Sequence, residues 1–502
     1  MKRIILGAIF VFAAAHFALG QNNVEIFDKY AEAARQEWHV PGMSISIVQD
    51  GKVLLSKGYG VKELGKDGAV DAQTAFGAMS TTKAMTAVAM AMLIEEGKVA
   101  WDDKVTRHLP YFRVDDPYIT AELKIRDLFT HNAGMGNADF LWAWTPELST
   151  DAMVRRMQFA KPEYSFRGGY EYQNVMYAVA GQVIEKVSGM SWERFMTERL
   201  FGPLGMKNTF PNYQQASKYP NLSSAHFDIK GKTTVIPETL ADSIAPAGAV
   251  WSTSDDIAKW VSFMLGGTTV NGKQLLKPES LAMVLRPQVI IPQNQFYPTT
   301  KLTKPHWTTY GLGWFQHDYR GEMINFHTGS LSGRTAIIGL LPSKNLGIYI
   351  FGNIDHAEVR HALMYKAFDL FAFGDNSRDW SKEAKVLYDG IKADGDKQQE
   401  AIKSKRVANT KPSLPLAAYV GKYSDPLFGT MDVELVDGKL KLIISQTATA
   451  TLEHWHFDTF QAIWKNAWWG ESPVGFQLDA VSGEVESINV EGAVLRRVSK
   501  SN

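Results

Sequence analysis

Residues 80–97 read STTKAMTAVAMAMLIEEG, and this stretch contains the first of three sequence motifs that together indicate the fold. Its apolar residues recur at helical spacing and Gly97 follows the last of them, which predicts one long helix. Ser80 and Lys83 open that helix as an S-x-x-K tetrad, and positions i and i+3 share a helical face. The lysine amine can therefore approach the serine hydroxyl. The positive potential of a helix N-terminus also lowers the pKa of a nearby ammonium, which is about 10.4 in a free lysine.

Two further motifs follow the tetrad along the chain. Taken alone, Ser80 and Lys83 are better explained as a helix-capping serine and a solvated lysine. Residues 172–174 (YQN), however, open a second predicted helix, and residues 327–330 (HTGS) precede a predicted strand. S-x-x-K, then Y-x-N, then a basic-T-G triplet is the signature of the penicillin-recognising serine enzymes. The chain resembles that family, most strongly its class C β-lactamases, D-Ala-D-Ala carboxypeptidases, D-aminopeptidases and esterases.

The resemblance implies a role for each residue of the first two motifs. Ser80 is the nucleophile that attacks an acyl carbon, and Lys83 and Tyr172 share the work of taking and returning its proton. Asn174 orients the substrate amide or the lysine. Which of Lys83 and Tyr172 is the main base stays open at this point.

The third motif is implied to bind substrate and to complete the oxyanion hole, which uses the backbone N–H groups of Ser80 and Ser330. The resemblance implies that Thr328 and Gly329 contact the substrate as well. His327 stands where many members of the family carry lysine, near the substrate carboxylate or leaving group. This H-x-G form resembles the aminopeptidase and esterase branches, and a neutral imidazole binds a carboxylate less well than an ammonium, so efficient β-lactam hydrolysis is in doubt. We expect titration of His327 near about pH 6.5 to shape the pH profile; the alternative is a histidine that only packs the strand end.

The function implied by these motifs is an exported serine hydrolase that forms an acyl-enzyme on small amides, D-residue peptides or esters. The alternatives are a cell-wall D,D-carboxypeptidase, a β-lactamase or, against the intact set of motifs, a non-catalytic ligand-binding protein. The resemblance implies no metal or organic cofactor. The partner is a small-molecule or peptide substrate, and the oligomeric state is left open.

The amino-acid composition further limits which partners, nucleophiles and metal sites are expected. Lys+Arg and Asp+Glu number 53 each, so no basic surplus exists to bind a phosphate backbone, and nucleic acid is not an expected partner. The chain has no cysteine, which excludes a cysteine nucleophile, cysteine-ligated zinc and a lipidated cysteine anchor. Residues 454–456 (HWH) could hold a metal, but no third ligand is evident and no metal site is predicted.

Strand patterns at both ends of the first 375 residues predict one sheet. Residues 43–47 alternate between apolar and polar side chains, and an Asp-Gly turn and the apolar run 53–55 follow, which predicts a hairpin. Residues 335–341 and 347–352 form a second predicted hairpin. Helices lie between the two hairpins, which predicts an α/β (α+β) domain with a helical insertion. The resemblance implies the β-lactamase/transpeptidase-like fold with an antiparallel sheet over residues 21–375.

The chain begins with the pattern of a secretory signal peptide over residues 1–20. Lys2 and Arg3 precede an apolar run, and small residues at 18 and 20 suit a signal peptidase. We therefore expect a periplasmic or extracellular protein without stable membrane insertion after cleavage. An uncleaved N-terminal anchor is the alternative.

The composition changes near residue 376, where a charged linker is predicted over residues 376–412. Short alternating runs from residue 413 to 502 then predict a small all-β sandwich or barrel. Residues 416–423 and 452–458 resemble, more loosely, the lipocalin-like domain found beside these hydrolases. Its tryptophans, such as Trp464, either fill the barrel core, line a pocket or face the hydrolase.

Overall fold

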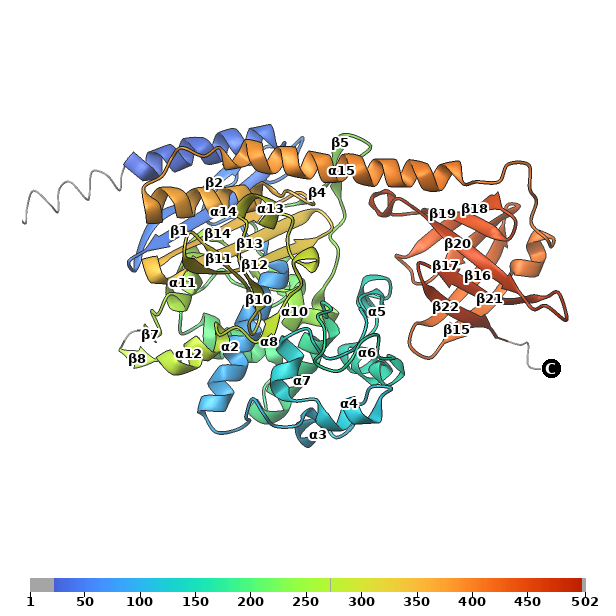
Figure 1. The fold of residues 1–502 in the computed structure, drawn as a ribbon, viewed down its shortest axis with the longest axis horizontal. Coiled ribbons are helices and arrows are strands. Elements are labelled where there is room, and N and C mark those ends of the chain that lie inside the picture. Colours follow the sequence, from blue (N-terminus) through green and yellow to red (C-terminus); the bar gives the residue numbers. More distant parts are fainter. Residues whose placement is uncertain (1–21, 271, 499–502) are drawn as a thin grey trace, which may run out of the picture.

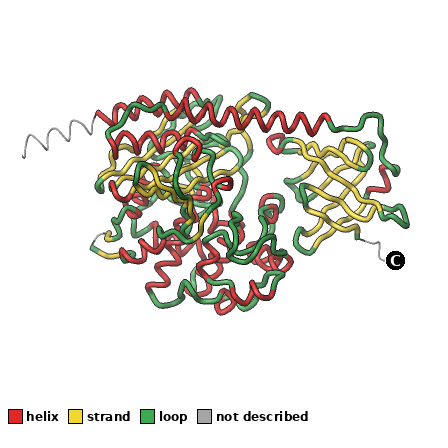
Figure 2. The backbone as a smooth tube through the Cα atoms, viewed as in Figure 1, coloured by secondary structure: helices red, strands yellow, loops and turns green. Residues whose placement is uncertain are grey.

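The computed structural model describes residues 22–270 and 272–498, so the predicted signal peptide lies outside the described residues. A large domain of helices and strands is joined to a small barrel by one long helix (Figure 1). Tracing the backbone by element type shows that the helices gather in the large domain and that the small domain is built of strands (Figure 2). Within the described residues, no helix is long and apolar enough to cross a membrane.

The large domain contains an eight-stranded antiparallel sheet built from both ends of the domain, as predicted. Strand β1 pairs with β2 on one side and with β14 on the other, so that Met43 faces Gly352. The strands, in spatial order, are β2 (Lys52–Gly60), β1 (Gly42–Gln49), β14 (Leu346–Gly352), β13 (Arg334–Leu341), β12 (Glu322–Leu331), β11 (Phe315–Tyr319), β10 (Thr308–Tyr310) and β9 (Val289–Ile290).

Both faces of this sheet are buried. Successive side chains of a strand point to opposite faces, and Ile337 and Ile338 of β13 accordingly belong to two different hydrophobic clusters. One cluster contains a helix over residues 22–37 and helix α14 (Val359–Ala367). The other contains α2 (Thr82–Glu95), α7 (Val175–Ser188) and α11 (Ser254–Met264). Burial on both faces explains why Ser44 and Ser46, which alternate with apolar residues in β1, are nevertheless inaccessible.

The insertion between the two hairpins is mainly helical. Its central helix α2 is buried from Thr82 to Leu93, as expected for a helix that is apolar on all sides. The remaining helices are α3 (Val105–His108), α4 (Pro117–Glu122), α5 (Phe140–Ala143), α6 (Thr150–Arg156), α8 (Trp192–Phe195), α9 (Tyr213–Ala216), α10 (Ala245–Gly248), α12 (Pro278–Val284) and α13 (Thr300–Thr303). Short strand pairs are β3 (Phe76–Gly77) with β6 (Trp251–Ser252), β4 (Ala225–Ile229) with β5 (Lys232–Ile236), and β7 (Thr269–Val270) with β8 (Lys273–Gln274).

The small domain is a closed antiparallel barrel, which decides between the predicted sandwich and barrel. Buried aromatic and aliphatic side chains fill its interior, among them Tyr419, Tyr423 and Leu495. Its strands, in order, are β15 (Gly421–Asp425), β16 (Gly429–Val436), β17 (Lys439–Ile443), β18 (Thr449–His456), β19 (Thr459–Trp464), β20 (Glu471–Leu478), β21 (Val485–Val490) and β22 (Ala493–Arg497).

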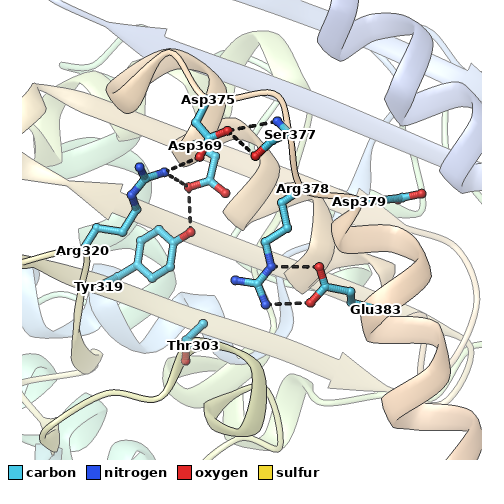
Figure 3. A pocket seen from close by; sticks show the side chains of 9 residues that line it. All are labelled: Thr303, Tyr319, Arg320, Asp369, Asp375, Ser377, Arg378, Asp379 and Glu383. Atoms are coloured by element: carbon cyan, nitrogen blue, oxygen red, sulfur yellow. Dashed lines mark hydrogen bonds and ion pairs between the residues drawn. The ribbon is translucent and has the colours of Figure 1, made fainter.

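Most of the predicted linker forms helix α15 (Trp380–Ser404), whose first turn packs into the large domain. Trp380 is fully buried there, and its indole N–H donates to Asp369 at 2.7 Å. A polar hollow of about 610 Å³ lies beside this turn, and ion pairs join Arg320 to Asp369 and Arg378 to Glu383 across it (Figure 3). The charged side chains of the hollow are paired with one another beside the first turn of α15, where they help to attach this helix to the large domain. Neither Ser80 nor Lys83 lines the hollow.

Candidate active site

Ser80 and Lys83 lie where the sequence places them, at the start of the buried helix α2. Ser80 sits in a single 3-10 turn, Met79–Thr81, that leads into the helix. The Lys83 ammonium nitrogen donates to Ser80 Oγ at 3.0 Å, to Asn174 Oδ1 at 2.6 Å and to the Ala247 carbonyl at 3.0 Å. Met79 has a φ of 49°, in the left-handed region that a non-glycine residue rarely adopts. Such strain is concentrated at functional sites.

The environment of Lys83 makes it a proton acceptor near neutral pH. Its side chain is fully buried, and this burial lowers its pKa to about 7 because an ammonium is poorly stabilised away from water. The Asp139 carboxylate acts in the opposite direction and raises the pKa of Lys83. A large share of the lysine is therefore neutral at pH 7 and able to accept the proton of Ser80.

Tyr172 completes the first group of polar residues. Its ring centre lies 4.7 Å from the Lys83 nitrogen, and the nearby Ser80 hydroxyl acts to lower the pKa of its phenol. Burial raises the pKa of Tyr172 well above its ordinary value, so the phenol stays protonated. Between the two candidate bases, these directions favour Lys83 as the base and Tyr172 as a proton donor.

Strand β12 brings the third motif against the serine. A Cβ atom on Gly329 would lie 2.5 Å from the Ala78 carbonyl oxygen and 3.0 Å from Ser80 N, so only glycine lets the strand approach this closely. Ser330, the next residue, is exposed at the strand end. The buried Arg360 guanidinium donates to Gly329 O and to Ser330 Oγ at 2.9 Å from behind the strand.

The other two residues of the motif bond to the protein interior. The Thr328 hydroxyl bonds to Tyr297. His327 is buried, and its Nδ1 lies 2.6 Å from the Thr328 carbonyl oxygen, which can only accept, so Nδ1 carries the proton. The Tyr310 hydroxyl lies 2.9 Å from the remaining nitrogen, Nε2, and donates to it. His131 Nε2 lies 3.2 Å from the same hydroxyl.

Burial and, to a smaller extent, the nearby charge of Lys83 together lower the pKa of His327 to about 3. The expectation that this histidine titrates near pH 6.5 is therefore wrong for the folded protein. Its two ring nitrogens serve a chain of hydrogen bonds, so His327 is neutral throughout the neutral pH range.

Sequence reasoning missed two residues that contact the motifs. Asp139 accepts a hydrogen bond from the Asn174 amide nitrogen at 2.7 Å, and Arg360 holds the end of β12. The sequence signal that could have identified Asp139 is a pair of polar residues, Asn137 and Asp139, among the small and apolar residues from Met135 to Phe140. Arg360 carried no such signal, because it lies on a helix that follows the sheet.

Comparison with known proteins agrees with this geometry. The chain is 28% identical over 482 residues to Unguisins hydrolase ungD from Aspergillus violaceofuscus, which covers 87% of this chain and 82% of the relative. It is 27% identical over 346 residues to Protein flp from Staphylococcus aureus strain N315, covering 67% of this chain and 64% of the relative.

Two solved structures are similar in fold. The octameric penicillin-binding protein homologue from Pyrococcus abyssi has a TM-score of 0.61 at 21% identity, with 94% of this chain and 99% of that chain covered. SurE has a TM-score of 0.57 at 18% identity, with 96% and 100% covered. A model for a domain of unknown function, DUF3471, matches residues 405–498. The Beta-lactamase family model matches residues 27–370, which is well over half of the chain, and the protein therefore belongs to the beta-lactamase family.

Proposed function

We propose that the protein is an exported serine hydrolase that forms an acyl-enzyme on Ser80 and acts on small amides, D-residue peptides or esters. The observation that carries this proposal is the contact between the Ser80 hydroxyl and a buried lysine whose pKa is lowered to about 7. Export is proposed from the signal-peptide pattern of residues 1–20 and would place the enzyme in the periplasm or outside the cell.

In the first half of the reaction, neutral Lys83 accepts the proton of Ser80 while Ser80 Oγ forms a bond to the acyl carbon. The carbonyl oxygen becomes an oxyanion, which the backbone N–H groups of Ser80 and Ser330 stabilise. The intermediate then collapses, the bond to the leaving group breaks, and the leaving nitrogen or oxygen takes a proton delivered from Lys83 with the help of the Tyr172 phenol. An ester between Ser80 and the acyl group remains.

In the second half, water attacks the same acyl carbon and gives a proton to Lys83. The second oxyanion collapses with departure of Ser80, which regains its proton, and the acid is released. Asn174 keeps the lysine nitrogen in place throughout, because its amide oxygen accepts from Lys83 at 2.6 Å.

The substrate class follows from the charge of the third motif. His327 is neutral and its nitrogens bond within the protein, so it offers no cation to the carboxylate of a β-lactam. Two of the similar proteins bear on the substrate: one is named as a hydrolase of unguisins, and SurE, which is similar in fold, has been solved with D-Leu. We therefore favour D-residue amides and neutral esters over penicillins.

The test combines active-site labelling with a substrate panel. A fluorophosphonate is expected to add to wild-type protein and not to Ser80→Ala, with the adduct located by mass spectrometry. D-aminoacyl amides, a D-Ala-D-Ala peptide, short-chain esters and nitrocefin are then compared, and amides or esters are expected to be turned over fastest. An adduct on another serine, or full turnover by Ser80→Ala, would refute the proposal.

A further inference from the structure

One segment of the large domain contacts both the Y-x-N motif and the barrel. On the catalytic side, Gln173 donates from its amide to the Met135 carbonyl at 2.9 Å. Asn137 donates to the Tyr172 carbonyl at 3.0 Å. The segment that begins at Met135 therefore binds the motif at several consecutive residues.

The most direct of these contacts leads to the catalytic lysine. Asn174 donates to Asp139 Oδ2 at 2.7 Å and accepts from Lys83 at 2.6 Å, so one amide connects the carboxylate to the ammonium. The other carboxylate oxygen, Asp139 Oδ1, is buried and has no hydrogen-bond partner among the described residues. The charge of Asp139 therefore acts on Lys83 through the Asn174 amide that lies between them, and it raises the pKa of Lys83.

The opposite side of the same segment packs on the barrel. Helix α5 begins directly after Asp139, and its Phe140 ring lies 4.2 Å from the ring of Phe428 in the turn between β15 and β16. Trp144, at the end of α5, lies 5.9 Å from Trp464 of the barrel. Figure 1 shows α5 on the side of the large domain that faces the barrel.

Helix α5 is held from two sides. Leu141 and Trp142 are buried in the core of the large domain, and Phe140 and Trp144 contact the barrel. The helix has four residues and no side-chain cap at its N-terminus, and an isolated helix of that length is unstable in water. The edge-to-face contact of Phe140 with Phe428 adds an attraction between the rings to the area that the pair buries. The position of Asp139, one residue before the helix, is thus set partly from the barrel.

We propose that the barrel is a positioning domain for the hydrolase site: Phe428 and Trp464 help to hold helix α5, and α5 holds the Asp139 carboxylate against Asn174, a hydrogen-bond partner of Lys83. The inference rests on the proposed function in one respect, which is that Lys83 serves as the base. It assigns the barrel a role in the chemistry without requiring it to bind a ligand of its own.

Loss of the Asp139 charge is expected to change the proton affinity of Lys83. The titratable groups that face Lys83 come from several elements, and Asp139 is the one that raises its pKa. The others are His131 before the Y-x-N segment, Tyr172 and Tyr177 at the start of α7, and His327 on β12.

The first experiment compares Phe428→Ala with Phe457→Ala in the full chain. Phe457 is a matched control, because it lies in another turn of the barrel and is 52% exposed. Phe428→Ala is expected to lower kcat/KM about tenfold, since small displacements of positioned groups cost this much or more, and Phe457→Ala to leave it unchanged. Equal kcat/KM in the two variants would overturn the proposal.

The second experiment asks whether the effect passes through Asp139. Asp139→Asn is expected to lower kcat and to move the acidic limb of the kcat/KM profile to lower pH, because the charge that raises the pKa of Lys83 is gone. Phe428→Ala is expected to move the limb in the same direction. In the double variant Phe428→Ala is expected to add less than about twofold, as for residues that act through one contact. Independent, multiplicative losses or an unmoved limb would overturn the proposal.

Labelling separates this inference from the proposed function. If the fluorophosphonate does not label Ser80 in wild-type protein, the proposed function fails. If it labels wild type and Phe428→Ala at equal rates while thermal unfolding shows both folded, the proposed function stands and the role of the barrel is refuted.

Discussion

The pH profile of the enzyme is expected to report Lys83, not His327. The structure places the pKa of Lys83 at about 7 and that of His327 at about 3. Only the neutral lysine accepts the proton of Ser80, so activity is expected to rise with pH through about 7. At pH 5 about 1% of a group with that pKa is neutral, which makes kcat/KM about a hundredfold lower than at pH 9.

The variant that tests this assignment is His327→Gln. Glutamine replaces one neutral side chain by another, so the charge around Lys83 is unchanged. The loss of the bond from Tyr310 is expected to lower kcat/KM at every pH, while the midpoint of the acidic limb stays within about half a pH unit. The assay is kcat/KM on one neutral ester from pH 5 to 9 at constant ionic strength, corrected for uncatalysed hydrolysis. A limb near pH 6.5 that disappears in His327→Gln would refute the reasoning.

Three further variants test other contacts of the site and the fold. Tyr172→Phe is expected to lower kcat by about a hundredfold with a smaller effect on KM, because the phenol donates a proton in the transition state; an unchanged kcat in steady-state assays would remove it from the mechanism. Gly329→Ala places a Cβ 2.5 Å from the Ala78 carbonyl oxygen, so strand β12 must shift from Ser80, and labelling of Ser80 is expected to slow by tenfold or more. Trp380→Ala is expected to cost about 3–5 kcal/mol in denaturant unfolding of the large domain; a loss below about 1 kcal/mol would show that α15 is not part of its core.

Mainly apolar runs at 335–341 and 347–352 predicted the second hairpin of the sheet, and the alternation of apolar and polar residues over 43–47 predicted the first. It did not show that β1 is buried on both sides, since Ser44 and Ser46 look like solvent-facing residues in the sequence. The region over residues 376–412 was predicted as a linker because most of its side chains are charged or polar. Helix α15 makes up most of it, and the three buried residues of that helix, Trp380, Ser381 and Ala384, are outnumbered by exposed charges.

The resemblance implied that Ser80, Lys83 and Asn174 lie together, and in the structure Lys83 contacts both of the others. The proton affinities could not be predicted, since they depend on which groups the fold buries. Burial lowers the pKa of both Lys83 and His327. The pKa of Lys83 nevertheless stays near neutral pH, at about 7, whereas that of His327 falls to about 3. Partners such as Asp139 and Arg360 become visible only when distant segments are brought into contact.

The buried state of His327 also decides what a lysine at this position would do. By sequence, His327→Lys restores the cation of the family and improves binding of carboxylates. In the structure that ammonium would replace a ring with 1% exposure, close to the charges of Lys83 and Arg360. A second buried cation raises the cost of protonating Lys83 and is itself poorly solvated. The neutral histidine therefore suits a site whose catalytic lysine must lose its proton. The choice between His and Lys at position 327 affects the protonation of Lys83 as much as it affects the binding of a substrate carboxylate.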